Sequence, residues 1–253
     1  MISAVVIISK AEWYPLEGVI ASVAPVAEEV VVNVDAAEPK TLAVIQDIAT
    51  RYPLKLVISP WNWEARDKGQ ELARQTNLAV ENASGDWILD VQADEVLHEN
   101  EHEQLLEYVR RAPDDISGFR LVRLYFFREP ELLRWDWTHS LVRLFRKGSH
   151  KIDGDAMNSQ TLWGRVADAH GVYLYHYSRV ARSEEIIERI MSLSRLFHAP
   201  QTLTRPQTYD FRTMEYDSFS SDNPPRAVDE EDVLVEFTGT HPKYIESWLK
   251  RLE

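Results

Sequence analysis

The sequence predicts an α/β fold built on a doubly wound, mostly parallel sheet. Up to Arg111, short apolar segments rich in Val and Ile alternate with segments of helical period, and such alternation is typical of βαβ units. The apolar segments are continuous rather than alternating, which indicates strands that are buried on both faces. Right-handed crossovers between such strands place their C-terminal ends along one edge of the sheet.

The first half of the chain is expected to hold four strands and four helices. The strands are predicted at Ala4–Ile8, Glu29–Val34, Leu54–Ile58 and Trp87–Val91, and the helices at Pro15–Val23, Lys40–Tyr52, Lys68–Ala83 and Glu103–Arg111. Apolar residues at near-helical spacing support the second helix, and the Ser84-Gly85 pair is a typical stop for the third.

The pattern changes after Arg111, where strand-like segments alternate between apolar and polar residues as half-buried strands do. These strands are predicted at Gly118–Phe126, Leu141–Arg146 and Val172–Tyr177, with helices at Ser183–His198 and Tyr244–Leu252. Between those helices, residues 199–231 are rich in Pro, Asp, Ser and Thr, which indicates irregular structure. We therefore expect one domain over residues 1–198 and a helical and irregular C-terminal extension over residues 199–253.

Composition limits the classes of function. The chain has 253 residues and a formal net charge of −13, so a nucleic-acid partner is not expected, because such binding needs a dense basic face. The apolar N-terminal run Ile2–Ile8 is too short to span a membrane. Cysteine is absent, which fits the cytoplasm. We expect a cytoplasmic protein without a transmembrane segment, either free or peripheral at the inner membrane.

Three acids mark the end of the fourth predicted strand. Asp90, Asp94 and Glu95 follow the apolar run that begins at Trp87. Ligands of α/β sheets bind outside the C-terminal ends of the strands, and carboxylates gathered there suit a hard divalent cation that can also contact phosphate. The alternative is an acidic turn that faces solvent.

The stretch from Arg74 to Glu95 resembles the nucleotide-sugar glycosyltransferases of the GT-A type, family 2. The resemblance rests on Arg74 and Asn77 in the helix, the Gly85-Asp86-Trp87 entry into the strand, and the acidic loop after it. It implies a GT-A-like fold, with a nucleotide-sugar-binding half over residues 1–100 and an acceptor half over residues 101–198. It also implies transfer of a sugar, with inversion and with help from Mn²⁺ or Mg²⁺. The donor would be a nucleotide-sugar, with a UDP-sugar favoured, and the acceptor a hydroxyl of a saccharide or other molecule.

The resemblance assigns metal ligands. It makes Asp94 the ligand of the metal or diphosphate, with Glu95 close behind it and His176 as a further ligand. Gln92 stands where relatives carry the first Asp of the motif, and a Gln side chain offers an oxygen but no charge. A histidine within an aromatic strand can instead be a core residue.

The resemblance also assigns donor-binding residues, of which Gln92 is one. The others are Ser9 and Lys10 after the first strand, Asp35 after the second, Lys68 at the start of the third helix, and Arg74 within it. Ordinary alternatives are an exposed lysine at Lys10, a turn residue at Asp35 and a salt bridge on the helix surface at Arg74.

In the acceptor half, Met157-Asn158 replaces the His-Glu pair of relatives. Asp155 is the nearest candidate for the general base that takes the proton of the acceptor hydroxyl, and Asp153 is a weaker one. Trp135 and Trp137 are candidates for an acceptor platform, since aromatic rings pack on the apolar faces of sugars. The alternatives are a turn at Asp155 and core packing for the tryptophans.

Two other functions stay open at this point. The replacements at Gln92 and Met157-Asn158 also fit a non-catalytic relative that binds a nucleotide or a sugar. A nucleotidyltransferase would share the α/β fold, but it is expected to carry a Gly-rich loop with Arg after the first strand, and Ser9–Pro15 has none.

Overall fold

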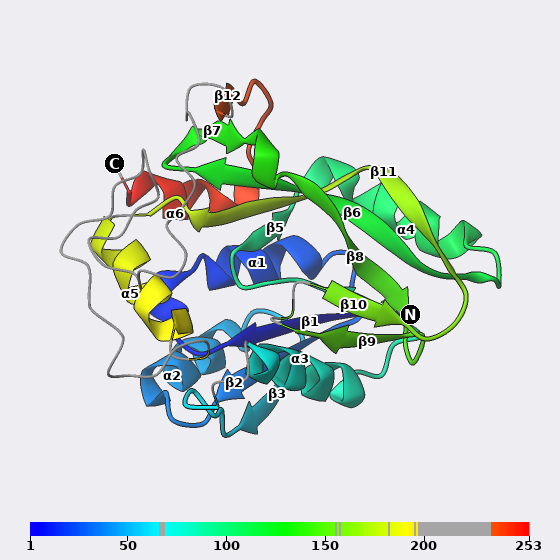
Figure 1. The fold of residues 1–253 in the computed structure, drawn as a ribbon, viewed down its shortest axis with the longest axis horizontal. Coiled ribbons are helices and arrows are strands. Elements are labelled where there is room, and N and C mark those ends of the chain that lie inside the picture. Colours follow the sequence, from blue (N-terminus) through cyan, green and yellow to red (C-terminus); the bar gives the residue numbers. More distant parts are fainter. Residues whose placement is uncertain are drawn as a thin grey trace, which may run out of the picture.

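The computed structural model describes residues 1–65, 69–154, 156, 158–181, 183–194, 196 and 234–252. Within these ranges a ten-stranded sheet runs in the order β12-β7-β6-β8-β4-β1-β2-β3, with β11 and β5 joined to it through β6. Figure 1 shows β3 at one end of this sheet and β12 at the other. The α/β fold predicted from the sequence is confirmed.

The N-terminal half is the parallel part of the sheet. Its strands are β1 (Ile2–Ile8), β2 (Glu29–Asp35), β3 (Leu54–Ser59) and β4 (Trp87–Asp90), and its helices are α1 (Leu16–Val23), α2 (Pro39–Ile48) and α3 (Gln70–Asn82). Parallel pairing joins β3 to β2, β2 to β1 and β1 to β4. The four C-terminal strand ends therefore share one edge, as the sequence predicts.

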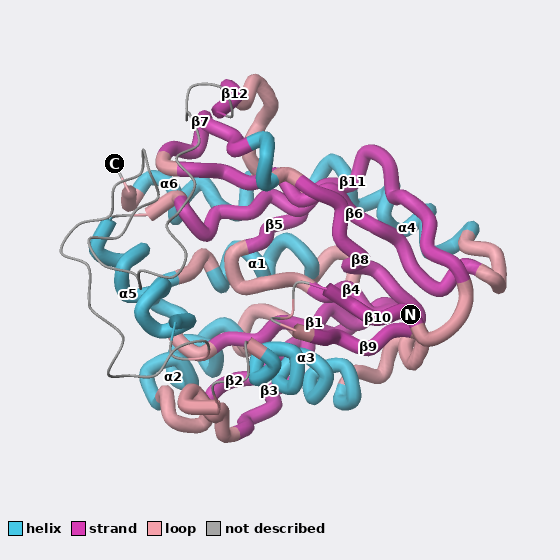
Figure 2. The backbone as a smooth tube through the Cα atoms, in the orientation of Figure 1, coloured by secondary structure: helices cyan, strands magenta, loops and turns pink. Residues whose placement is uncertain are grey.

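The second half extends the same sheet with mostly antiparallel strands. After α4 (His102–Arg111) come β6 (Ile116–Phe127), β8 (His139–Arg146) and β11 (Arg165–Arg179), followed by α5 (Ser183–Ser194). Strand β8 lies antiparallel between β4 and β6, and β11 runs parallel to β6. Figure 2 shows these strands as one continuous band with the N-terminal ones.

Five short strands were not predicted from the sequence. They are β5 (Glu95–Leu97), β7 (Glu129–Arg134), β9 (His150–Asp153), β10 (Asn158–Thr161) and β12 (Leu234–Glu236). Unlike the short strands β3 and β4, these segments contain no run of three apolar residues, and β7 contains Pro130. Proline removes a backbone donor and is a poor sequence signal for a strand.

Helices cover both faces of the sheet. Ala4 and Val6 of β1 point into a large core with α1 and α2, whereas Val5 points into a smaller core with α3. This alternation follows from the two-residue period of a strand. Helix α3 is also fixed to β9, because the Asn77 side chain exchanges hydrogen bonds of 2.8 and 3.1 Å with the backbone of Ile152.

The C-terminal segment 234–252 packs into the larger core. Its short α6 (Glu246–Lys250) follows a 3-10 turn over Lys243–Ile245, and Ile245 and Trp248 belong to the same core as β1. A Cβ atom at Gly18 of α1 would lie only 2.6 Å from the carbonyl oxygen of Tyr244, so glycine permits this close approach. Within the described ranges, every helix is too short or too polar to cross a membrane.

Glu101 connects the start of α4 to β11. Its two carboxyl oxygens accept hydrogen bonds from the Tyr173 backbone N–H at 2.7 Å and from the Tyr175 hydroxyl at 3.2 Å. Burial raises the pKa of this carboxyl to about 7, more than the two hydrogen bonds lower it. The folded protein therefore favours the protonated form of Glu101 more than the unfolded chain does.

We expect stability to depend on pH through Glu101. The contribution of its protonated form is fully present below the ordinary pKa of 4.5 and is lost as the pH rises through about 7. Glu101→Gln should remove this dependence and stabilise the protein at pH 8 by on the order of a few kcal/mol. A Gln amide can accept from the Tyr173 N–H and donate to the Tyr175 hydroxyl.

Urea unfolding of both proteins at pH 5 and pH 8 measures this difference. Glu103→Gln, at an exposed site on the same helix, is the matched control. Equal free energies of unfolding for wild type and Glu101→Gln at pH 8 would contradict the expectation.

Candidate active site

A cavity of about 380 Å³ lies where the C-terminal ends of the parallel strands meet the second half of the chain. Its walls come from the ends of β1 and β4, the loop after β3, helices α3 and α5, and strands β6 and β11. Such an edge is the usual ligand site of an α/β sheet. The sequence predicts the same place from the acids after Trp87.

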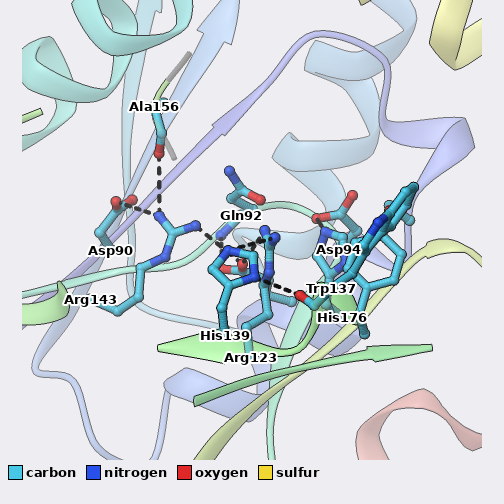
Figure 3. Close-up of polar contacts among 12 residues, drawn as sticks. Asp90, Gln92, Asp94, Arg123, Trp137, His139, Arg143, Ala156 and His176 are labelled. Carbon is cyan, nitrogen blue, oxygen red and sulfur yellow. Dashed lines mark hydrogen bonds and ion pairs between the residues drawn. The ribbon is translucent and has the colours of Figure 1, made fainter. Parts of the chain in front are cut away.

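Asp94 and His176 meet in this cavity. Asp94 lies in the loop after β4 and His176 lies on β11, with 3.4 Å between the carboxyl oxygen Oδ1 and the imidazole Nε2. The Tyr177 backbone N–H donates to the Asp94 carbonyl at 2.9 Å, which fixes this loop against β11. Figure 3 shows both side chains beside Gln92.

Burial sets the protonation of this pair. It raises the pKa of the Asp94 carboxyl to about 6, and the nearby Glu95 adds to the rise. Burial and the neighbouring arginines lower the pKa of His176 well below its usual value. At neutral pH the site therefore presents a carboxylate and a neutral imidazole, which are both good metal ligands.

The described residues contain no group of three or more His, Cys, Asp or Glu side chains that could hold a metal ion. Asp94 and His176 would thus be two protein ligands. Two ligands fit a cation whose other positions are filled by phosphate oxygens and water, which is how Mg²⁺ is usually bound.

Glu95 lies beneath the cavity rather than in its lining. It is fully buried, and one carboxyl oxygen lies 3.2 Å from Arg143 and 3.7 Å from Arg123. The other oxygen accepts the Gln92 backbone N–H at 3.0 Å. The predicted role as a metal ligand is not favoured here, because both oxygens are already occupied by partners in the protein.

Asp90 forms a second ion pair with the same arginine. Arg143 Nη1 lies 2.8 Å from the Asp90 carboxylate and 3.5 Å from the carbonyl oxygen of Ala156 (Figure 3). Burial raises the pKa of Asp90 to about 6, although Arg143 opposes the rise. The alternation along β8 predicts that Arg143 is buried, since it lies on the same face of the strand as the buried Leu141 and Phe145.

The predicted donor residues divide into two groups. Ser9, Lys10 and Gln92 line the cavity, and the Lys10 ammonium lies 4.4 Å from the ring centre of Trp13. Asp35 is buried and is not among the lining residues, because its carboxylate accepts the Trp63 indole N–H at 2.7 Å and the Ala37 backbone N–H at 3.0 Å. Asp35 therefore positions Trp63, which lines the cavity in its place.

Arg74 was predicted to bind the donor, with a salt bridge on the helix surface as the alternative, and the structure contains that salt bridge. Its guanidinium contacts the buried Glu71 carboxylate at 2.5 Å, one turn earlier on α3, and it is not among the lining residues. Glu71 also accepts from the Asn62 backbone N–H at 3.0 Å, so Arg74 is part of the support of the loop after β3. Lys68 lies outside the described residues.

The two acceptor tryptophans differ in their surroundings. Trp135 is 65% exposed and does not line the cavity. Trp137 packs edge-on against Tyr125, with 4.8 Å between ring centres, and Tyr125 is a lining residue. Arg134 lies over the Trp137 ring at 4.3 Å. Trp137 thus supports the cavity wall, whereas Trp135 remains open to solvent.

Of the two predicted bases, only Asp153 is among the described residues. Asp155 lies outside the described residues, and its neighbour Ala156 lines the cavity with a φ of 64°. Asp153 is exposed, is not a lining residue, and accepts the Gly154 backbone N–H at 2.8 Å.

Sequence reasoning missed most of the charge in the cavity wall. Arg123, Arg179 and Arg189 line it together with Lys10, against the carboxyl groups of Glu38, Asp90 and Asp94. Arg123 could have been found from the alternation of β6, because it shares the parity of the buried Leu121 and Tyr125. The four cationic groups contrast with a chain whose net charge is −13.

Arg143→Met should destabilise the fold strongly. It leaves Asp90 and Glu95 buried without their main partner, which typically costs about 3–5 kcal/mol. Arg120→Met is the matched control, because it breaks an ion pair with Asp168 that is 40% and 47% exposed and typically costs about 0–1 kcal/mol. Urea unfolding at pH 7.5 measures both losses.

Adding Asp90→Asn to Arg143→Met should recover part of the lost stability, since it removes one of the unpaired charges. Similar losses for Arg143→Met and Arg120→Met would contradict the importance assigned to the buried network.

A family model described as "Glycosyl transferase family 2" matches residues 4–171. The lipopolysaccharide core biosynthesis glycosyltransferase LpsC of Rhizobium meliloti (strain 1021) is 27% identical over 169 residues, which cover 63% of this chain and 57% of that protein. The chain therefore spans little more than half the length of that curated relative.

Two solved structures are similar at lower identity. TarS 1-349 of S. aureus has a TM-score of 0.48 at 16% identity, over 79% of this chain and 66% of that one. Glucosyl-3-phosphoglycerate synthase of Mycobacterium tuberculosis has a TM-score of 0.35 at 17% identity, over 49% of this chain and 44% of that one. The family match over residues 4–171 covers well over half of the sequence, and the chain belongs to glycosyl transferase family 2.

Proposed function

We propose that this chain transfers a sugar from a nucleotide-sugar donor, in the first place a UDP-sugar, to a hydroxyl group of a saccharide or other acceptor. The observation that carries the proposal is the Asp94–His176 pair in a cavity with an excess of cationic side chains. Family membership supports the donor class. The name of LpsC, a glycosyltransferase of lipopolysaccharide core biosynthesis, supports a saccharide acceptor.

A divalent cation is part of the proposal. Asp94 and His176 would hold Mn²⁺ or Mg²⁺, and a cation there neutralises charge on the leaving diphosphate. The loop that carries Asp94 is already fixed by the Gln92 contact to Glu95 and by the Tyr177 contact. These residues thus present the two ligands in a set position before the donor arrives, and such preorganisation is the main source of electrostatic catalysis.

The remaining walls fit the other parts of a nucleotide-sugar. Trp61 and Trp63 line the cavity with 5.5 Å between their ring centres, and a nucleobase can stack on such aromatic faces. Lys10 and Arg123 provide positive charge for phosphate. The donor would lie with its base near the loop after β3 and its diphosphate near Asp94.

Inverting transfer also needs a base that takes the proton of the acceptor hydroxyl. Of the three acids that line the cavity, Asp90 is paired with Arg143, Asp94 is a proposed metal ligand, and Glu38 lies directly before α2. Asp153 is exposed outside the lining. We therefore keep Asp155 as the proposed base, next to the lining residue Ala156.

A non-catalytic binding protein is the second candidate, and one observation favours it. Arg143 holds both Asp90 and Glu95, and Gln92 carries no charge. Among the described contacts of these three acids, Asp94 is the acid that pairs with His176, whereas Asp90 and Glu95 pair with an arginine. A single carboxylate would bind a cation more weakly than two.

Asp94→Ala should abolish metal-dependent binding of the donor, because it removes the charged ligand of the pair. Calorimetric titration of a UDP-sugar, with and without Mn²⁺, measures the effect. The control is Asp86→Ala, at an exposed site whose side chain pairs with the chain N-terminus, and it should bind as wild type does. Unchanged affinity in Asp94→Ala would remove Asp94 from the site.

Asp155→Asn should preserve donor binding and lose transfer. Loss of a general base typically costs ~10²–10⁴-fold in rate, and Asn keeps the size of the side chain. Donor hydrolysis is the first assay, followed by acceptor screening, with Asp153→Asn as the matched control. Full activity of Asp155→Asn would place the base elsewhere, whereas a wild type that binds but never turns over the donor would favour the binding protein.

A further inference from the structure

Arg189 is a buried cation with unmet hydrogen-bond donors in the cavity wall. It lies on α5, is 4% exposed and lines the cavity. Its Nη1 donates to the Ser178 carbonyl at 3.0 Å. Its Nε and Nη2 are buried and have no hydrogen-bond partner in the part of the chain that the structure describes. Helix α5 lies beyond residue 171, where the family match ends.

Asp94 and Glu185 are near enough to favour the charged form of this guanidinium, but no described carboxylate accepts a hydrogen bond from it. The ring of Tyr14 lies 4.7 Å from the guanidinium carbon and holds it by a cation–π contact. Burial raises the pKa of the Tyr14 hydroxyl to about 12, so this neighbour is neutral at physiological pH. A buried guanidinium with unpaired N–H groups is costly. Among the described residues, the buried Nε of Arg143 also lacks a partner, whereas both Nη atoms of Arg143 are hydrogen-bonded, so the free Nη2 is what sets Arg189 apart.

The position of Arg189 indicates the chemistry of its partner. Asp94, the proposed metal ligand, lines the same cavity and is close enough for Arg189 to lower its pKa. A molecule that contacts both must therefore offer anionic oxygens to a guanidinium and to a cation at Asp94. A planar guanidinium binds phosphate oxygens through two parallel hydrogen bonds, and a diphosphate has enough oxygens for both contacts.

We propose that Arg189 binds the diphosphate of the nucleotide-sugar donor and stabilises it as the leaving group. This assignment rests on the proposed function. As the bond between the anomeric carbon and the diphosphate oxygen breaks, its electron pair passes to that oxygen. The acceptor oxygen forms the new bond, and its proton goes to the base. Arg189 neutralises the negative charge that develops on the diphosphate, so a residue of the C-terminal half completes the donor site.

The test compares Arg189→Gln and Arg189→Lys with wild type in calorimetric titrations of UDP and of uridine, with Mn²⁺ constant. Loss of charge-assisted hydrogen bonds should weaken UDP binding by about 10- to 100-fold. Uridine has no phosphate, so its affinity should change little. Lysine keeps the charge without the two parallel bonds, and an intermediate affinity for UDP is expected. Arg111→Gln, at an exposed site on α4, is the matched control.

Melting temperature separates binding from a structural role. Without ligand, Arg189→Gln should melt no lower than Arg111→Gln, because it removes a buried guanidinium whose Nε and Nη2 have no hydrogen-bond partner among the described residues. The rise in melting temperature caused by UDP should be smaller than in wild type, since that rise follows the affinity. A lower melting temperature without ligand, with UDP and uridine weakened together, would overturn the proposal in favour of a structural role.

Two further outcomes distinguish this proposal from the function on which it rests. If wild type binds UDP and Arg189→Gln binds it equally well, the role of Arg189 is overturned and the proposed function stands. If wild type binds none of UDP, GDP, CDP, ADP and dTDP, both are overturned.

Discussion

The shape of the cavity depends on the buried contact of Arg143 with Asp90 and Glu95. The arginine is 1% exposed and reaches the two carboxylates at 2.8 and 3.2 Å. Any one of these charges buried alone would cost several kcal/mol, so the loss of one partner weakens the packing of β8, β4 and β5. Asp90 ends β4 and Glu95 begins β5. The contact therefore fixes both ends of the loop that holds Gln92 and Asp94.

A loop fixed in this way presents its side chains without rearrangement. Glu95 holds the backbone of Gln92, and the Tyr177 N–H holds the carbonyl of Asp94. His176 is brought to the same point by the pairing of β11 with β5. The cost of ordering these groups is met during folding, and binding energy from a donor is not spent on it. The acids that appear equivalent in the sequence thus have different surroundings: Asp90 and Glu95 pair with Arg143, and Asp94 pairs with His176 as the proposed ligand.

The sequence was a good guide to the fold wherever a segment was long enough to show a period. The continuous apolar run of β1 and the helical spacing in α2 predicted the parallel half and the edge at which ligands bind. Asp35 shows the limit for site residues, since its contact with Trp63 depends on a loop that brings together positions 28 apart. Arg189 shows this limit more strongly, because no neighbouring residue in the sequence indicates that its side chain lines the cavity. A contact made by tertiary packing leaves no local pattern in the sequence. Arg123 and Arg143 differ, because each lies two residues from buried apolar residues of its own strand, and this alternation can be seen in the sequence.

The charge of the cavity gives a physical reason why Gln92 can replace an acid. Four cationic side chains line the cavity against three carboxyl groups, and an aspartate at position 92 would bring these numbers to balance. With glutamine, the wall keeps an excess of positive charge inside a chain of net charge −13. Interactions in such a buried site are screened far less than on the surface. The excess favours an anionic ligand such as the proposed diphosphate, and a cation held at Asp94 would have less charge to neutralise than in a site with two acids. On the proposed function, Gln92 and the cationic side chains would act together, with arginine and lysine supplying part of the positive charge that a metal held by two carboxylates would otherwise provide.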